Sequence, residues 1–361
     1  MTSQWLRSVA GPVLALGLIA GLAACSGDND DDPSTSPSVP VVESTADPSA
    51  EPSVDPEADP SADPSADPET DPSADPEASP TPEPITPSSD LEALVVEGEP
   101  PTVAVPAPWA VDQSRNKVLT YGTGPTVPSG GLVKVNYVGV NGRTGEVFDN
   151  SFDSGQPVAF SLSGVVAGFA KGLAGQRVGS RVLLAMPGSD GYDGADRTEV
   201  GIAEGDTLVF VVDVNDTPRS GPQGDPVAPA AGLPVVGGSD SRPTLSLPDN
   251  AVFPTGVIAQ PLITGSGETI TAWGQIQVDY TEYAWSPDGA FRFVRQTYGH
   301  SPVTGVLGDA IAGWQEALAG AAQGSRLLVV VPPDQGYPNG DARIGVKAGD
   351  ASVFVVDVLF A

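Results

Sequence analysis

The chain has 361 residues, which is enough for two or three domains, and a formal net charge of −30. Residues 26–100 hold 21 Asp and Glu residues and no Lys or Arg, so one segment carries most of this charge. Nucleic-acid binding requires clustered basic residues, and Cys–His or multi-His metal sites require more than one Cys and one His, so both are excluded and no cofactor is predicted.

The first 25 residues are typical of a secretion signal. Arg7 lies in a short positive region, residues 10–20 form an apolar run, and small residues precede a lone cysteine in Leu22-Ala23-Ala24-Cys25. This end resembles a bacterial lipobox, which predicts a signal peptide over 1–25 and a lipidated Cys25 that anchors the protein outside the cytoplasm, on the cell membrane. The alternative is an ordinary signal peptide followed by a free thiol. The lack of a second cysteine to pair with Cys25 favours the lipobox.

The next segment, residues 26–100, is of low complexity. The unit Asp-Pro-x-x repeats with a period of four from Asp55 to Pro76. Proline fixes φ and removes backbone donors, and few apolar side chains are present to offset chain entropy. We therefore expect a disordered, extended tether with partial polyproline-II character. A spacer is the interpretation we favour, and a proline-rich ligand for a partner is the alternative.

Beyond the tether the chain repeats itself at an offset of 142 to 145 residues. The matches include Pro101-Thr102 with Pro243-Thr244, Val135-Asn136-Tyr137 with Val278-Asp279-Tyr280, Gly179-Ser180-Arg181 with Gly324-Ser325-Arg326, and Phe210-Val211-Val212-Asp213-Val214 with Phe354-Val355-Val356-Asp357-Val358. A two-copy repeat of this length predicts two similar domains rather than a solenoid. The first is placed at 101–217, a Pro- and Gly-rich linker at 218–242, and the second, degenerate domain at 243–361.

Each copy is predicted to be mostly strand. Runs rich in β-branched residues, bounded by Gly, Pro or Asp, lie at 132–140, 181–186 and 207–214, and again at 275–280, 326–331 and 352–360. One short helix fits each copy, at 166–173 and at 311–319. Several strands with a single helix predict an α+β fold in which the helix packs on one face of an antiparallel sheet.

Aromatic and aliphatic residues next to the loops of the first copy carry a resemblance. The motifs are Tyr137, then Gly145-Glu146-Val147-Phe148-Asp149-Asn150-Ser151-Phe152, Gly155-Gln156-Pro157-Val158-Ala159-Phe160, Val165-Val166-Ala167-Gly168-Phe169, Gly191-Tyr192 and Thr207-Leu208-Val209-Phe210. From about residue 117 to 214, in order and spacing, they resemble the FKBP family of peptidyl-prolyl cis/trans isomerases, which bind macrolide immunosuppressants. The second copy, from about 257 to 360, resembles the same family more weakly.

The resemblance implies two tandem FKBP-like domains, each a curled antiparallel sheet around one short helix with an apolar cavity between them. In the first domain Phe169 would form the cavity floor, Asp149 would lie at the rim, and the Tyr192 hydroxyl and Val166 amide would face substrate carbonyls. The walls would be formed by Tyr137, Phe148, Val165, Val166, Ile202 and Phe210. Core packing explains Phe160 and Phe210 as well as pocket lining does, but a pure core has no use for the polar groups of Tyr137, Asp149 and Tyr192.

Several positions depart from the family pattern. Ser154 stands where the family often has a basic partner for the rim Asp, Val158 replaces an aromatic residue, and Phe169 replaces a Trp. In the second domain Phe291-Arg292-Phe293 is expected in the region of the Phe-Asp pair, without a carboxylate, and His300-Ser301-Pro302 replaces Gln-Pro. The candidate pocket residues that remain there are Tyr280, Ile311, Trp314, Tyr337 and Phe354.

The resemblance implies an enzyme without a cofactor, a peptidyl-prolyl cis-trans isomerase. Its substrates would be unfolded or partly folded exported polypeptides with X-Pro bonds, at the outer face of the membrane. The competing hypothesis is a non-catalytic peptide-binding chaperone or scaffold that uses the same pockets, which Ser154 and the degenerate second copy favour. A structural role in the cell envelope is the third.

Overall fold

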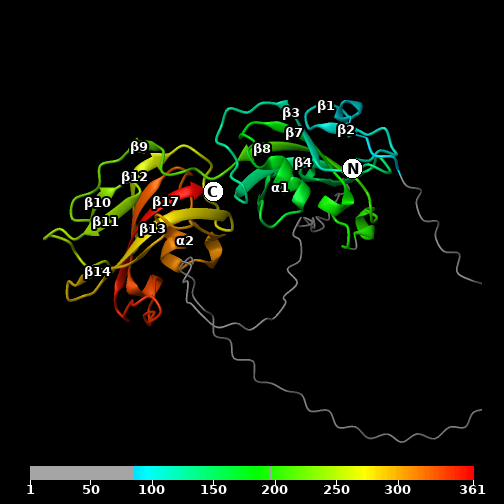
Figure 1. The fold of residues 1–361 in the computed structure, drawn as a ribbon. Coiled ribbons are helices and arrows are strands. Elements are labelled where there is room, and N and C mark those ends of the chain that lie inside the picture. The colour runs from blue at the N-terminus through cyan, green and yellow to red at the C-terminus, as the bar shows by residue number, and fades with distance from the viewer. Residues whose placement is uncertain (1–84, 89, 196) are drawn as a thin grey trace, which may run out of the picture. The chain divides into compact units, whose positions relative to one another are not determined.

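The computed structural model describes residues 85–88, 90–195 and 197–361 (Figure 1). The predicted signal peptide, Cys25 and most of the predicted tether lie outside these residues. Within them, no helix is both long enough and apolar enough to cross a membrane. Two antiparallel sheets, each with one short α-helix, form the larger part of the described chain, which confirms the prediction of a duplicated α+β fold.

The first sheet has six strands, in the order β3-β7-β8-β4-β5, with β6 paired to β4. The bounds are β3 Arg115–Thr120, β4 Leu132–Asn141, β5 Val147–Asn150, β6 Val158–Ser161, β7 Arg181–Met186, β8 Leu208–Asp216 and α1 Ala167–Leu173. Helix α1 packs closely on β7, because a Cβ at Gly168 would lie 2.3 Å from the Met186 sulfur and one at Gly172 would lie 2.4 Å from a Leu184 methyl carbon. The two glycines thus bring Phe169 and Leu173 fully into the core.

The second sheet has seven strands, in the order β14-β13-β17-β16-β12-β9, with β15 paired to β13. The bounds are β9 Gly224–Pro226, β12 Ile258–Gly265, β13 Gln275–Trp285, β14 Phe291–Gln296, β15 Val303–Val306, β16 Arg326–Val331, β17 Ala351–Phe360 and α2 Ala312–Leu318. Short 3-10 helices at Leu91–Ala93, Ser151–Ser154, Gly188–Asp190, Thr198–Val200, Leu307–Asp309 and Pro333–Gln335 lie in the connections. Helix α2 approaches β16 as closely as α1 approaches β7, because a Cβ at Gly313 would lie 2.4 Å from a Val331 methyl carbon. All six predicted strands and both predicted helices are present.

A small hairpin covers the face of each sheet that lies opposite the helix. Strands β1 (Val95–Glu97) and β2 (Thr102–Ala104) form the first, and β10 (Val235–Ser239) and β11 (Arg242–Ser246) form the second. The first hairpin segment adds Leu94, Trp109 and Val111 to a cluster with Val209 and Val211 of β8. Because both faces of each sheet are covered, the central strands are mostly apolar, and β17 is buried at all ten positions.

The predicted starts of the two domains, at residues 101 and 243, fall inside these hairpins. Residue 101 lies in the turn between β1 and β2, and residue 243 lies inside β11. The expectation of a tether up to residue 100 is wrong for residues 91–100, because this stretch forms a 3-10 helix and β1 and buries Leu94 against the sheet. The expected linker at 218–242 likewise contains β9 and β10.

Candidate functional site

In the first domain, four aromatic rings meet around the helix. Phe169 of α1 is fully buried, and its ring centroid lies 4.6 Å from that of Phe210 on β8, at an interplanar angle of 77°. Tyr137 of β4 and Phe160 of β6 approach the same ring at 6.1 and 5.8 Å, also edge-on. Edge-to-face contacts are the favoured geometry for aromatic pairs. The predicted floor residue therefore has the predicted neighbours.

Half-buried residues surround this aromatic cluster, and together we call them the rim: Phe148, Asp149, Val158, Phe160, Val165 and Tyr192. The apolar members of the rim pack against the same core as Tyr137, Val166, Phe169, Ile202 and Phe210, so the structure brings all the predicted pocket residues of this domain together. Phe148 lies over Gly139, where a Cβ would come within 2.8 Å of both the Phe148 and Phe210 rings. A side chain at position 139 would thus displace the rim.

The polar groups of the site divide into those that are paired and those that are free to donate. The Tyr137 hydroxyl donates to Asp149 over 2.6 Å, and burial together with this hydrogen bond raises the pKa of Tyr137. Among the described residues, neither the Tyr192 hydroxyl nor the Val166 amide has a hydrogen-bond acceptor. Burial raises the pKa of Tyr192 to about 12, with Arg197 opposing the rise, so its hydroxyl keeps its proton at neutral pH.

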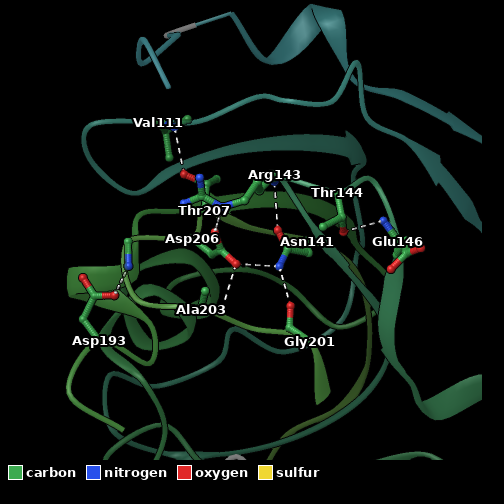
Figure 2. Close-up of polar contacts among 11 residues, drawn as sticks. Val111, Asn141, Arg143, Thr144, Glu146, Asp193, Gly201, Ala203, Asp206 and Thr207 are labelled. Carbon is green, nitrogen blue, oxygen red and sulfur yellow. Dashed lines mark hydrogen bonds and ion pairs between the residues drawn. The ribbon is translucent and has the colours of Figure 1, made fainter. Parts of the chain in front are cut away.

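The loop that carries Tyr192 and Ile202 is held at its end by a buried carboxylate (Figure 2). Asp206 accepts hydrogen bonds from the Asn141 side chain over 2.8 Å, from the Ala203 amide over 2.9 Å and from the Arg143 guanidinium. Asn141 also donates to the Gly201 carbonyl over 2.9 Å. Because Asp206 is almost completely buried, its bonds to Asn141 and Arg143 fix the loop against the end of β4, and its bond to the Ala203 amide holds the loop's own backbone.

The sequence analysis did not identify this clamp, and it also missed Arg197. The Arg197 guanidinium carbon lies 5.2 Å from the centre of the Tyr192 ring. The only signal available was the position of Asn141 and Arg143 at the end of β4, with Asp206 just before β8. Such polar residues at strand ends are common in loops, so the pattern alone did not single them out.

In the second domain, strand pairing shows which residues stand where the rim residues stand in the first. Asp149 pairs with Gly139 on β4, and Arg295 pairs with Glu282 on β13. The Tyr137 amide donates a hydrogen bond to the Ser151 hydroxyl. The Tyr280 amide donates to the Thr297 hydroxyl in the same way, so the two hairpins have the same register here. The expectation that Phe291-Arg292-Phe293 takes the place of the Phe-Asp pair is therefore wrong. Val294 and Arg295 occupy these positions.

Arg292 has a different role. Its guanidinium donates to the Gly345 carbonyl over 2.7 Å and to Asp350 over 2.6 Å. Asp350 also accepts from the Lys347 amide and from the Ser286 hydroxyl, so it is the counterpart of Asp206. One arginine thus replaces both Asn141 and Arg143 in clamping the loop of the second domain.

The second domain fills its site with its own charged side chains. Arg295 donates to Glu282 over 2.7 Å and to the Tyr337 hydroxyl over 3.0 Å, and its guanidinium lies 5.5 Å from the centre of the Tyr280 ring. Glu282 is fully buried, and burial raises its pKa although Arg295 opposes the rise. Tyr337, the counterpart of Tyr192, is buried and already hydrogen-bonded.

The apolar rim is also reduced in the second domain. Val294 stands at the position of Phe148, and Gly305 stands at the position of Phe160, as the pairing of β15 with β13 shows. Trp314 fills more of the floor than Phe169 does, and its indole nitrogen is buried without a hydrogen-bond acceptor among the described residues. Tyr280, Ile311, Trp314 and Phe354 are all fully buried. The predicted residues are together, but they form a closed core.

The comparisons with known proteins agree with this architecture. The family described as FKBP-type peptidyl-prolyl cis-trans isomerase matches residues 124–215 and 266–359. A probable FK506-binding protein from Corynebacterium glutamicum is 37% identical over 118 residues, which is 32% of this chain and 97% of that protein. The FK506-binding protein of Streptomyces anulatus is 41% identical over 102 residues, which is 27% of this chain and 81% of that protein.

The crystal structure of FkpA from Escherichia coli is 33% identical, with a TM-score of 0.27, and the match covers 28% of this chain and 47% of FkpA. The two family matches together span about half of the chain, and the Corynebacterium protein is matched over nearly its whole length. On this evidence, the chain belongs to the FKBP-type peptidyl-prolyl cis-trans isomerase family.

Proposed function

We propose that the first domain is the catalytic one and that it assists the folding of exported proteins at the outer face of the membrane, held there by a lipidated Cys25. Prolyl isomerase activity itself follows from membership of the family. The observation that carries the assignment to the first domain is the pair of free donors, the Tyr192 hydroxyl and the Val166 amide, beside a rim of half-buried apolar side chains. In the second domain the Ile311 amide likewise has no acceptor among the described residues, but the Tyr337 hydroxyl is engaged by Arg295 and the apolar rim is reduced.

The site accelerates isomerisation without a proton transfer or a covalent step. Rotation about a peptide bond crosses a barrier of about 18–20 kcal/mol, because the planar form is stabilised by resonance. The twisted transition state has lost this resonance and carries a less polar carbonyl. An apolar site around Phe169 therefore stabilises the transition state more than the planar ground state, which is what lowers a barrier. Tyr192 and the Val166 amide would hold the flanking carbonyls.

Catalysis is tested with proline-limited refolding of a model protein, using the full chain. We expect Phe169→Leu, which keeps an apolar floor but removes the ring, to lower kcat/KM by at least about tenfold, since a misplaced substrate costs up to about a hundredfold. Trp314→Leu in the second domain is the matched control and should leave the rate unchanged. An equal loss in both variants would contradict the assignment to the first domain.

The location is tested separately. In a host that processes lipoproteins, the wild-type chain should incorporate a labelled fatty acid and fractionate with membranes, whereas Cys25→Ser should do neither. A Cys25→Ser chain that still carries the label would contradict the anchor. Proline isomerisation takes tens of seconds without a catalyst, so exported proteins that fold outside the membrane are suitable substrates.

A further inference from the structure

An arginine at the first domain's site has unused hydrogen-bonding capacity. The Arg197 guanidinium lies against the Tyr192 ring, and its Nε is buried with no acceptor among the described residues. The side chain is 25% exposed, and the nearest carboxylate oxygen in an ion pair, that of Glu199, is 4.0 Å away on a side chain that is 57% exposed. The exposed part of a partly desolvated guanidinium can bind a carboxylate.

The acidic residue on the rim does not compensate for this cation. Asp149 is engaged by the Tyr137 hydroxyl. Arg197 lowers the pKa of Tyr192, against burial and Asp149, which raise it. The Arg197 guanidinium thus lies beside the hydroxyl that is expected to face the X-Pro bond.

The second domain has the opposite charges at the two equivalent positions. The bridge between Arg197 and Ile202 in the first domain corresponds to the bridge between Asp341 and Val346 in the second. Asp341 thus stands where Arg197 stands, just as Arg295 stands where Asp149 stands. In the first domain the arginine beside the tyrosine hydroxyl is Arg197, whose ion pair with Glu199 is long, whereas in the second it is Arg295, which is closely paired with Glu282.

The chain itself contains many dipeptides that would complement this charge. Within residues 47–84, which we call the Asp-Pro segment, nine of the eleven prolines follow an acidic residue, and no Lys or Arg is present. These acidic residues are Asp47, Glu51, Asp55, Asp59, Asp63, Asp67, Asp71, Asp75 and Glu83. Every such dipeptide combines a prolyl bond, the reactive group of this family, with a carboxylate next to it.

The Asp-Pro segment joins the first domain directly. The residues that follow it, from Leu91 to Val111, pack on the outer face of the first sheet. A domain of this size is roughly 35–40 Å across, and an extended chain spans at most about 3.3–3.6 Å per residue. Asp63 and the acidic residues before it precede residue 85 by more than 20 positions, so the chain is long enough to reach any part of the domain surface.

We propose that Arg197 makes the first domain prefer Asp or Glu immediately before proline, and that the Asp-Pro segment is its intramolecular ligand. This inference rests on the proposed function of the first domain. Attachment to the same chain gives a linked ligand an effective concentration on the millimolar order. A weak affinity for each dipeptide is then sufficient for occupancy, and the repetition of the unit supplies many equivalent chances to bind.

The preference is tested on the full chain with tetrapeptides that differ only in Glu, Gln or Leu before proline, using exchange NMR. We expect kcat/KM for the Glu peptide to exceed that for the Gln peptide by at least about fivefold at low salt, and less at high salt because ions screen the attraction. Arg197→Gln should reduce this ratio to about one. Arg177→Gln, which removes the same charge from a side chain that donates to the Gly124 carbonyl over 3.1 Å, should preserve it.

The intramolecular ligand is tested by changing every Asp and Glu of residues 47–84 to Asn and Gln. This variant should show a KM for the Glu peptide that is several-fold lower than that of the wild type, because the competing ligand is lost. An unchanged KM, or a Glu-to-Gln ratio that survives Arg197→Gln, would overturn the inference. If the Leu peptide is not accelerated either, the proposed function fails as well, so the two failures are distinguishable.

Discussion

The two domains share one fold, and their sites differ at several positions, four of which lie at the rim or directly beside it. Gly139, Phe148, Asp149 and Phe160 in the first correspond to Glu282, Val294, Arg295 and Gly305 in the second. In the first domain, large rings leave two donors free beside an apolar rim. In the second, the ion pair of Arg295 and Glu282 occupies the equivalent positions, and Arg295 also donates a hydrogen bond to the Tyr337 hydroxyl. The contrast shows that the fold and the helix floor are kept when the rim is lost, which supports the proposal that the first domain is the catalytic one.

The largest expected effect is on the stability of the second domain, and it tests whether the two domains differ in function. Glu282→Ala should lower the free energy of unfolding of the second domain by about 3 kcal/mol or more, because it leaves Arg295 without its buried partner. Calorimetry on the full chain should show the shift in one of two transitions, with isomerase activity unchanged. The double change Glu282→Leu and Arg295→Leu is the control and should be close to neutral. Activity that falls together with the transition would mean that the second domain catalyses.

The matched clamps give the next largest effect. Asp206→Ala and Asp350→Ala each leave several buried donors without an acceptor. Each should therefore lower the free energy of unfolding of its own domain by about 2–3 kcal/mol. Only Asp206→Ala should also lower kcat/KM, by about tenfold, because the loop it holds carries Tyr192 and Ile202. The two variants are compared in the same unfolding and peptide-exchange assays. A loss of activity in the Asp350→Ala protein would erase the functional difference between the domains.

A smaller effect is expected at the paired tyrosines. Tyr192→Phe removes a single donated hydrogen bond, which is worth about 0.5–1.5 kcal/mol, so kcat/KM should fall by about twofold to tenfold. Tyr337→Phe removes a hydroxyl that Arg295 already engages and should leave the rate unaltered. Peptide exchange under identical conditions measures both. Should Tyr192→Phe be silent, its hydroxyl would not be the donor to the substrate.

The smallest effect concerns pH. The Tyr192 hydroxyl donates only while it is protonated, and its pKa is raised to about 12 by burial. The donor is therefore present below that pKa and lost only as pH rises through it, so the rate should be flat from about pH 6 to about pH 10. The profile of kcat/KM against pH checks this. A step within this range would contradict the assignment of the Tyr192 hydroxyl as the group that sets the profile.

The strongly apolar strands and both helices could be predicted from sequence, because their β-branched runs and Gly-bounded ends are local signals. Strands β3 and β12 were not predicted, since Arg115, Lys117 and Pro261 interrupt the apolar pattern of these outer strands. The first site was predicted from contiguous motifs. In the second, Arg295 follows its partner Glu282 by 13 residues, whereas Asp149 follows Gly139 by ten. Only the pairing of β13 with β14 resolves this longer hairpin.

The hairpins that cover the outer faces of the sheets are part of the repeated unit of this chain. Both lie ahead of the residues that match the family, which begin at 124 and 266. Yet they carry the same Pro-Thr start, at 101 and 243, and insert Val103 and Leu245 into equivalent clusters. The repeated unit is therefore longer than the part that matches the family, because it includes the hairpin that covers the outer face of each sheet.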